Sequence, residues 1–157
     1  AVDALDAHRE MFEKHRNDYG PFADLLDKGM ETRAEDYSRA WSLGREFSGK
    51  LRRIFAQVDV VACPSMPTPP LPVDEKGIPE FDGIGRWYRF CVPYNFSRNP
   101  TVSVPCGFSE DGLPISLQLI GRHFDEQTIL SLSNAYQRST DWHTRYPPDI
   151  DVDQQYL

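Results

Sequence analysis

Apolar residues in the first third of the chain recur every three or four positions, which is the spacing of amphipathic helices. A first short helix is predicted to end between Asn17 and Gly20. Pro21 can open a second helix, and Gly29 stands where a left-handed C-cap is expected. The apolar positions of these two helices are Val2, Leu5, Met11, Phe12, Phe22, Leu25 and Leu26.

The clearest helical pattern follows, between residues 33 and 57. A helix over this range would be about 37 Å long at about 1.5 Å per residue. Thr32 and Glu35 stand three residues apart, the spacing of a capping box, in which each side chain binds a free backbone amide at the helix start. Such a long apolar stripe requires an apolar surface to cover it. The stripe consists of Tyr37, Ala40, Trp41, Gly44, Phe47, Ser48, Leu51, Ile54, Phe55 and Val58.

Three shorter apolar runs predict strands. Residues 58–63 are rich in β-branched side chains and indicate a buried strand, which Pro64 ends at the start of a proline-rich loop. Residues 101–106 and 113–120 alternate between apolar and polar positions. Because Gly112 can supply the positive φ of a tight turn between them, these two runs predict a hairpin.

A final helix and a polar tail complete the pattern. Asp125 is predicted to cap this helix. The pattern as a whole is α/β, with helices over residues 1–57, sheet and helix over 58–146, and a loose tail over 147–157. We expect residues 1–146 to belong to one domain. The inner face of the last helix carries Ile129, Leu132, Ser133 and Tyr136.

Composition narrows the picture by exclusion. A net charge of −7 argues against a nucleic-acid partner, which would require a basic face. No apolar run reaches about 18 residues, so no membrane span is expected, and the acidic N-terminal sequence is unlike a signal peptide. Cys63, Cys91 and Cys106 lack CxxC spacing. Neither a disulfide framework nor a zinc site is therefore expected, and a reducing, cytoplasmic location is favoured.

Candidate catalytic groups are scattered. A serine nucleophile needs a base within hydrogen-bond reach, and the chain has no G-x-S-x-G turn to present one. His8, His15, His123 and His143 lie on or beside predicted helices, where surface or capping roles are expected, and their spacing predicts no metal site. The three cysteines have apolar neighbours, which is typical of buried thiols.

Aromatic residues are concentrated between positions 81 and 96. A hydrophobic core or a ligand pocket would each account for them, and both alternatives stay open for each residue. The segment follows a long loop, and long loops in compact domains are often functional. The aromatic residues are Phe81, Trp87, Tyr88, Phe90, Tyr94 and Phe96.

Several short motifs follow one another between residues 32 and 147. A long helix leads into an Asp-aliphatic-Cys-Pro strand and a proline-rich loop. Asn-aromatic-Ser begins at Asn95, Ser-Val-Pro-Cys-Gly begins at Ser103, and Gly-Leu-Pro at Gly112 opens a strand that ends in Gln-Leu-Ile-Gly. In this order and spacing, the chain resembles the C-terminal part of the amidase signature family of hydrolases.

The resemblance implies an α/β/α sandwich around a large mixed sheet, of which this chain supplies a part. It also implies that amides are hydrolysed by a Ser, a cis-Ser and a Lys that lie N-terminal to the matched region. This chain has no Gly-Gly or Ser-Ser pair, so the resemblance assigns it no catalytic residue, no metal and no cofactor. It is expected instead to form part of the wall of the substrate pocket. The candidates for that wall are Trp87, Tyr88, Phe90, Tyr94, Asn95 and Arg98.

Two residues depart from the family pattern. Arg98 stands where a glycine usually follows three residues after the motif Asn95, and Thr101 stands where an alanine usually follows the motif proline. An arginine at a position that needs positive φ is strained. Either the local backbone differs, or Arg98 reaches into the pocket.

Two functions fit these observations. The first is a segment of an amide hydrolase, inactive alone, that meets a small amide substrate only in the intact enzyme. The second is a non-catalytic module that reuses the same half-fold for self-assembly or partner binding. Unpaired strand edges and uncovered helices favour a partner in both cases, either a second copy or the N-terminal amidase region. The expected contact residues are Val102, Leu117 and the stripe around Trp41.

Overall fold

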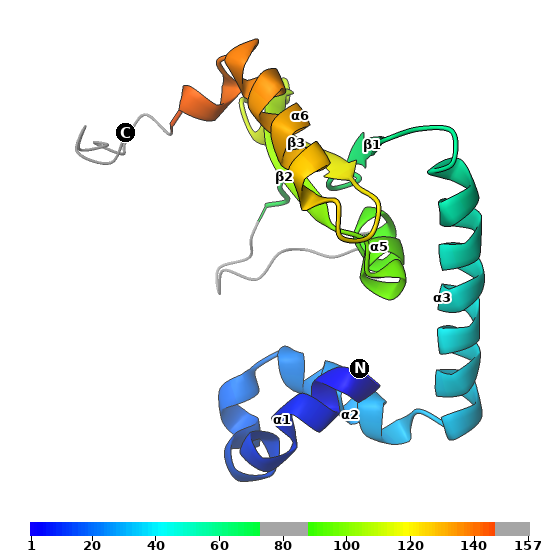
Figure 1. Cartoon of the computed structure of the whole chain (residues 1–157). Helices are drawn as coiled ribbons and strands as arrows, with labels where there is room; N and C mark the ends of the chain where they lie inside the picture. The colour runs from blue at the N-terminus through cyan, green and yellow to red at the C-terminus, as the bar shows by residue number, and fades with distance from the viewer. Residues whose placement is uncertain (73–87, 147–157) are drawn as a thin grey trace. The chain divides into compact units, whose positions relative to one another are not determined.

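A computed structural model describes residues 1–72 and 88–146. In these residues the chain forms five α-helices and a three-stranded antiparallel sheet (Figure 1). It divides into two compact units, Ala1–Glu46 and Phe47–Leu157. The long helix α3 (Ala34–Ile54) begins in the first unit and ends in the second. None of the helices in the described ranges has the length and apolar character that crossing a membrane requires.

The first unit packs short helices around a core of aromatic and aliphatic side chains. Its elements are α1 (Val2–His15), a 3₁₀ turn (Arg16–Tyr19), α2 (Phe22–Glu31) and the start of α3. Leu26 is fully buried, whereas Met11, predicted to share the apolar side of α1, is 61% exposed. The apolar side of α1 is therefore narrower than the sequence indicates. The buried core consists of Leu5, Phe12, Ala23 and Leu26.

Gly29 lies inside α2, so the predicted left-handed C-cap is wrong. The helix continues to Glu31. Glycine is needed here for a different reason, because a Cβ atom at this position would lie 2.9 Å from the carbonyl oxygen of Ala1. The start of α1 thus packs directly against the backbone of α2.

The start of α3 also differs from the prediction. The hydroxyl of Thr32 donates to the carbonyl oxygen of Lys28 at 2.7 Å, and Glu35 forms an ion pair with Arg33. The two side chains therefore do not form the predicted capping box. The helix itself is confirmed, but it ends at Ile54, three residues earlier than predicted.

The second unit is built on a sheet with the strand order β1-β3-β2. Its strands are β1 (Val61–Pro64), β2 (Thr101–Phe108) and β3 (Pro114–Ile120). The predicted hairpin of β2 and β3 is confirmed, and Gly112 has the positive φ of 76° that the turn requires. β1 pairs antiparallel with the other edge of β3 and begins three residues later than predicted.

Helices cover this sheet. α6 (Glu126–Arg138) packs along β2 and β3, and its buried residues are Ile129 and Ser133 (Figure 1). A 3₁₀ turn (Tyr88–Phe90) and the short helix α5 (Val92–Ser97) precede β2. The end of α3 contributes to the core of this unit. That core consists of Leu51, Phe55 and Ile120, with Phe47, Val61, Cys63 and Tyr94 packed against it.

Candidate functional site

A row of polar side chains crosses the sheet of the second unit. Cys63, Gln118 and Ser103 lie side by side on β1, β3 and β2. The buried amide of Gln118 donates to the carbonyl oxygen of Phe90 at 2.8 Å and to Cys63 Sγ at 3.5 Å. At the end of the row, the hydroxyl of Ser65 donates to that of Ser103 at 2.9 Å. Since a buried amide is stable only when it is hydrogen-bonded, Gln118 fixes the turn that contains Phe90.

Tyr94 extends this row toward α3. Its ring centroid lies 6.2 Å from that of Phe47, and its hydroxyl lies 3.9 Å from Cys63 Sγ. Burial, and after it the neighbouring Cys63, raises the pKa of Tyr94 from 10.0 to about 12. The hydroxyl is therefore neutral near pH 7, where it can donate a hydrogen bond but cannot act as a base.

The other predicted pocket residues lie near the same row. Phe90 is half-buried and provides the carbonyl that accepts the Gln118 amide. Three candidates are exposed, namely Tyr88, Asn95 and Arg98. Trp87 lies outside the described residues. The structure thus brings Phe90 and Tyr94 together around Gln118 and Cys63, and a pocket role for all six residues stays a prediction.

Arg98 is the C-cap of α5 and has a left-handed backbone, with φ 58° and ψ 29°. The position therefore has the conformation that favours glycine. An arginine adopts it at a cost of about 1 kcal/mol, because its Cβ crowds the following carbonyl oxygen.

A pocket of about 820 Å³ opens at the end of β1. Cys106, one of its lining residues, is the extra residue of a bulge between Pro105 and Gly107 in β2. Burial raises the pKa of the Cys106 thiol, which is therefore neutral near pH 7. The lining includes Ala62, Pro64, Met66, Cys106, Ile115 and Leu117.

This pocket can bind an apolar group, but its described lining includes no Asp, Glu, His, Lys or Arg to carry out acid–base chemistry. None of the described pocket-wall candidates lines it. The sequence signal for it is the run of prolines after β1, which the hydrophobic pattern indicates only as an irregular loop. Its shape depends on contacts between strands that the pattern does not reveal.

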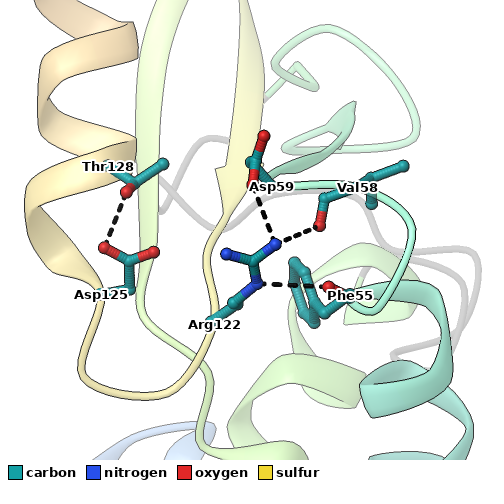
Figure 2. A network of polar contacts seen from close by, with 6 residues as sticks. All are labelled: Phe55, Val58, Asp59, Arg122, Asp125 and Thr128. Carbon is teal, nitrogen blue, oxygen red and sulfur yellow. Dashed lines mark hydrogen bonds and ion pairs between the residues drawn. The ribbon is translucent and has the colours of Figure 1, made fainter.

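Arg122 joins the end of β3 to the end of α3, as Figure 2 shows. Its guanidinium donates to the carbonyl oxygens of Phe55 at 3.2 Å and Val58 at 3.1 Å, and it pairs with Asp59 at 2.8 Å. The carbonyls follow a helix C-terminus, where a cation is favoured. No sequence motif singles out Arg122, because its partners lie 63 to 67 residues away.

Two of the histidines make contacts within their own unit. His8 Nδ1 lies 3.1 Å from the hydroxyl of Tyr19, and His123 Nε2 lies 2.6 Å from the carbonyl oxygen of Ser97. Because a carbonyl only accepts, His123 must donate from Nε2. Over residues 1–72 and 88–146, no three His, Cys, Asp or Glu side chains are grouped so as to hold a metal ion.

Known proteins are similar to this chain in sequence and in fold. The Amidase family profile matches residues 15–130. A glutamyl-tRNA(Gln) amidotransferase subunit of Roseiflexus sp. (strain RS-1) is 44% identical over 119 residues, which are 74% of this chain and 23% of that protein. A putative amidase AmiD of Mycobacterium bovis is 31% identical over 151 residues, which are 94% of this chain and 32% of that protein.

Solved structures agree in fold. A crystal structure of an amidase superposes with a TM-score of 0.72 at 20% identity, over 88% of this chain and 33% of that one. A bacterial aryl acylamidase of the amidase signature family gives a TM-score of 0.66 at 21% identity, over 91% of this chain and 32% of that one. The chain thus spans only about a quarter to a third of the length of the proteins it matches.

Proposed function

This chain belongs to the amidase family, and we propose that it is part of an enzyme that hydrolyses amide C–N bonds. In this proposal it is the C-terminal portion of an α/β/α sandwich and supplies sheet scaffold and one wall of the substrate pocket. The Ser, cis-Ser and Lys that break the bond act from the preceding region of the enzyme. The observation that carries the proposal is the match of residues 15–130 to the Amidase profile, together with the 31% identity to a putative amidase over 94% of the chain.

The way residues 88–98 are held supports their role as the wall. Gln118 fixes the carbonyl of Phe90, and the ring of Tyr94 packs against Phe47. A backbone fixed in this way can present exposed side chains in one geometry, which is what substrate binding requires. The exposed side chains of residues 88–98 include those of Tyr88, Asn95 and Arg98.

A chimera tests this function. The chain replaces the matched stretch of the mycobacterial putative amidase, and hydrolysis of simple aliphatic and aryl amides is measured. We expect the chimera to hydrolyse amides and the isolated 157-residue chain to be inactive. A folded but inactive chimera would contradict the proposal. So would turnover by the isolated chain that survives purification and is abolished by covalent labelling of one of its own serines or cysteines.

Variants of the chimera test the wall itself. Tyr88→Ala and Asn95→Ala should change kcat/KM for some amides more than for others, because they alter contacts with the substrate and not with the reacting groups. Gln127→Ala, at an exposed position on α6, is the matched control and should leave all rates unchanged. Equal effects of all three substitutions on every amide would argue against a wall at residues 88–98.

A second function has one observation in its favour. The apolar pocket beside β1 includes Leu117, a residue expected at a contact with a partner. A self-assembling module would bury this surface against a second copy, with Val102 or the Trp41 stripe as further contacts. Leu117→Asp should then dissociate an oligomer seen by sedimentation, and a monodisperse wild-type monomer would exclude it.

For both functions we propose a location in the cytoplasm. The support for it is that Cys63, Cys91 and Cys106 are free thiols, which are typical of a reducing compartment. Fractionation of the cells that produce the protein tests this location.

A further inference from the structure

Two residues other than glycine have a left-handed backbone in the described part of the chain, Arg98 with φ 58° and Phe124 with φ 60°. This conformation is unfavourable for any residue that has a Cβ atom. Phe124 is also 96% exposed. Its ring contacts that of His123, at 6.5 Å between centroids, but stays exposed to water, and such strain often marks a functional contact.

The two strained residues belong to connections that are hydrogen-bonded to each other. The side-chain amide of Asn99 donates to the carbonyl oxygen of Gly121 at 2.7 Å, and the Gly121 amide donates to that of Pro100 at 3.0 Å. His123 Nε2 donates to the carbonyl oxygen of Ser97 at 2.6 Å. Each strained residue is therefore the direct chain neighbour of a residue in this set of contacts.

The connection that carries Phe124 is also fixed from two other sides. Arg122 holds it to residues 55–59, and the hydroxyl of Thr128 donates to the carboxylate of Asp125 at 2.7 Å (Figure 2). The amide of Asp125 donates to the carbonyl oxygen of Arg122 at 3.1 Å. The ring of Phe124 is thus exposed on a fixed backbone, which is how a preorganised binding residue is presented.

We propose that Arg98 and Phe124 form one docking point, through which this chain packs against the part of an amidase polypeptide that its relatives carry beyond the matched stretch. The inference rests on the proposed function and adds the contact surface. The occupant follows from the comparisons: the two relatives above carry this stretch as only 23% and 32% of their own length, so further polypeptide of the same molecule is there to cover it.

The chemistry of the pair defines the covering surface. A phenylalanine ring requires an apolar socket, and a guanidinium favours a carboxylate or carbonyl oxygen as its partner. Aromatic and arginine side chains are also the types that contribute most at protein contacts. The covering segment is therefore expected to be apolar at its centre and acidic at one edge.

The test compares the isolated chain with the full-length chimera described above. Phe124→Asn keeps a residue that tolerates a left-handed backbone but removes the ring. We expect the urea midpoint of the isolated chain to stay the same or rise. In the chimera, the ratio of folded to unfolded protein should fall about tenfold or more, the effect of truncating a central aromatic contact. Leu130→Asn, at a position 58% exposed in the same unit, is the matched control and should act equally in both proteins.

Arg98→Gly relieves the backbone strain in both proteins, because glycine adopts a left-handed backbone readily. In the chimera it also removes the proposed contact of the guanidinium, so relative to wild type the urea midpoint should be lower there than in the isolated chain. A midpoint that moves in the same direction and by the same amount in both proteins would overturn the docking role of Arg98.

Thiol labelling of Phe124→Cys, read by mass spectrometry of the single peptide, provides a second measurement. The introduced thiol should react at least about tenfold more slowly in the chimera than in the isolated chain, since an anchor at a contact is excluded from water. Equal labelling in a cooperatively folded chimera would overturn the docking point and leave the proposed function intact. A chimera that unfolds in two separate transitions would contradict the proposed function itself. Protection in the isolated chain, together with an oligomer by sedimentation, would assign the point to a second copy and overturn the inference.

Discussion

The two units of the molecule differ in the kind of contact that stabilises each of them internally. In the first, side chains close in sequence pack ring against ring, as Phe12 and Tyr19 do at 5.2 Å between centroids. In the second, polar side chains join distant parts of the chain: Gln118 binds Phe90 across 28 residues, and Arg122 binds Phe55 across 67. Contacts between distant residues require a larger loss of chain entropy before they form. The second unit, which carries the candidate site, therefore depends on a few specific hydrogen bonds.

The largest test of this comparison removes a fully buried side chain from each unit. Leu26 and Ile120 are both 0% exposed. Replacing either with alanine should lower the free energy of unfolding by about 2 to 5 kcal/mol, through lost burial and the cavity that remains. In native-state hydrogen exchange, Leu26→Ala should reduce protection in α1 and α2, and Ile120→Ala should reduce it in the sheet. Equal loss of protection across both units from either substitution would mean that they do not behave as separate cores.

A smaller effect is expected for Arg122→Met, which keeps the apolar stem and removes the guanidinium. Three contacts are lost, with Phe55, Val58 and Asp59, but the Arg122 side chain is 44% exposed, so water replaces part of each. We expect a loss of about 1 to 2 kcal/mol by urea unfolding, with faster exchange at residues 55–59.

Two further variants control for charge. Arg122→Lys keeps the charge without the planar group, and it should recover only part of the loss. Arg138→Met removes an exposed cation from the last turn of α6 and should change stability by only a few tenths of a kcal/mol. A loss after Arg138→Met as large as that after Arg122→Met would point to net charge and not to the contacts in Figure 2.

Periodicity predicts α1, α2, α3, α6 and the hairpin, but it predicts neither α5 nor the contacts between the elements. The helices and the hairpin follow from apolar spacings of about 3.6 and about 2 residues, which are local properties. Pairing with β3 sets the start of β1, since Val61 lies opposite Ile120, and no local pattern contains that register. The predicted C-cap at Gly29 is wrong for the same reason, because the atom that requires a glycine there is the carbonyl oxygen of Ala1.

In the candidate site, too, the sequence predicts the segment but not the contacts that position it. Composition indicates the aromatic-rich segment. Arg98 stands out because the family usually has a glycine at that position. Gln118 begins the Gln-Leu-Ile-Gly motif and Arg122 follows it, but the motif does not state the role of either side chain. Their importance lies in which carbonyls they reach, and that is decided by the fold.

Backbone strain gives a matched pair of predictions of about 1 kcal/mol or less. Arg98→Gly should relieve about 0.5 to 1 kcal/mol of backbone strain in the isolated chain, because φ of 58° is unfavourable for arginine. Gly112→Ala should destabilise it by about 1 kcal/mol, because φ of 76° is unfavourable for alanine. A Cβ atom there would meet nothing within 4 Å, so no steric clash adds to this strain. Urea midpoints measure both. A stabilising Gly112→Ala would show that the hairpin turn relaxes to a different conformation.

The last prediction concerns pH and tests whether the polar row orders Tyr94. Its pKa is raised from 10.0 to about 12, first by burial and then by Cys63, so the fold favours the neutral phenol. The contribution of Tyr94 to stability is therefore present in full below about pH 10 and is lost as the pH rises through about 12. Spectrophotometric titration should show one tyrosine that ionises late, and Tyr94→Phe should remove that step and flatten the alkaline loss of stability. Tyr88→Phe, at a position 44% exposed in the same unit, is the matched control and should leave the late step in place. A late step that survives Tyr94→Phe would place the buried phenol elsewhere and leave Cys63 and Gln118 without the role described for them.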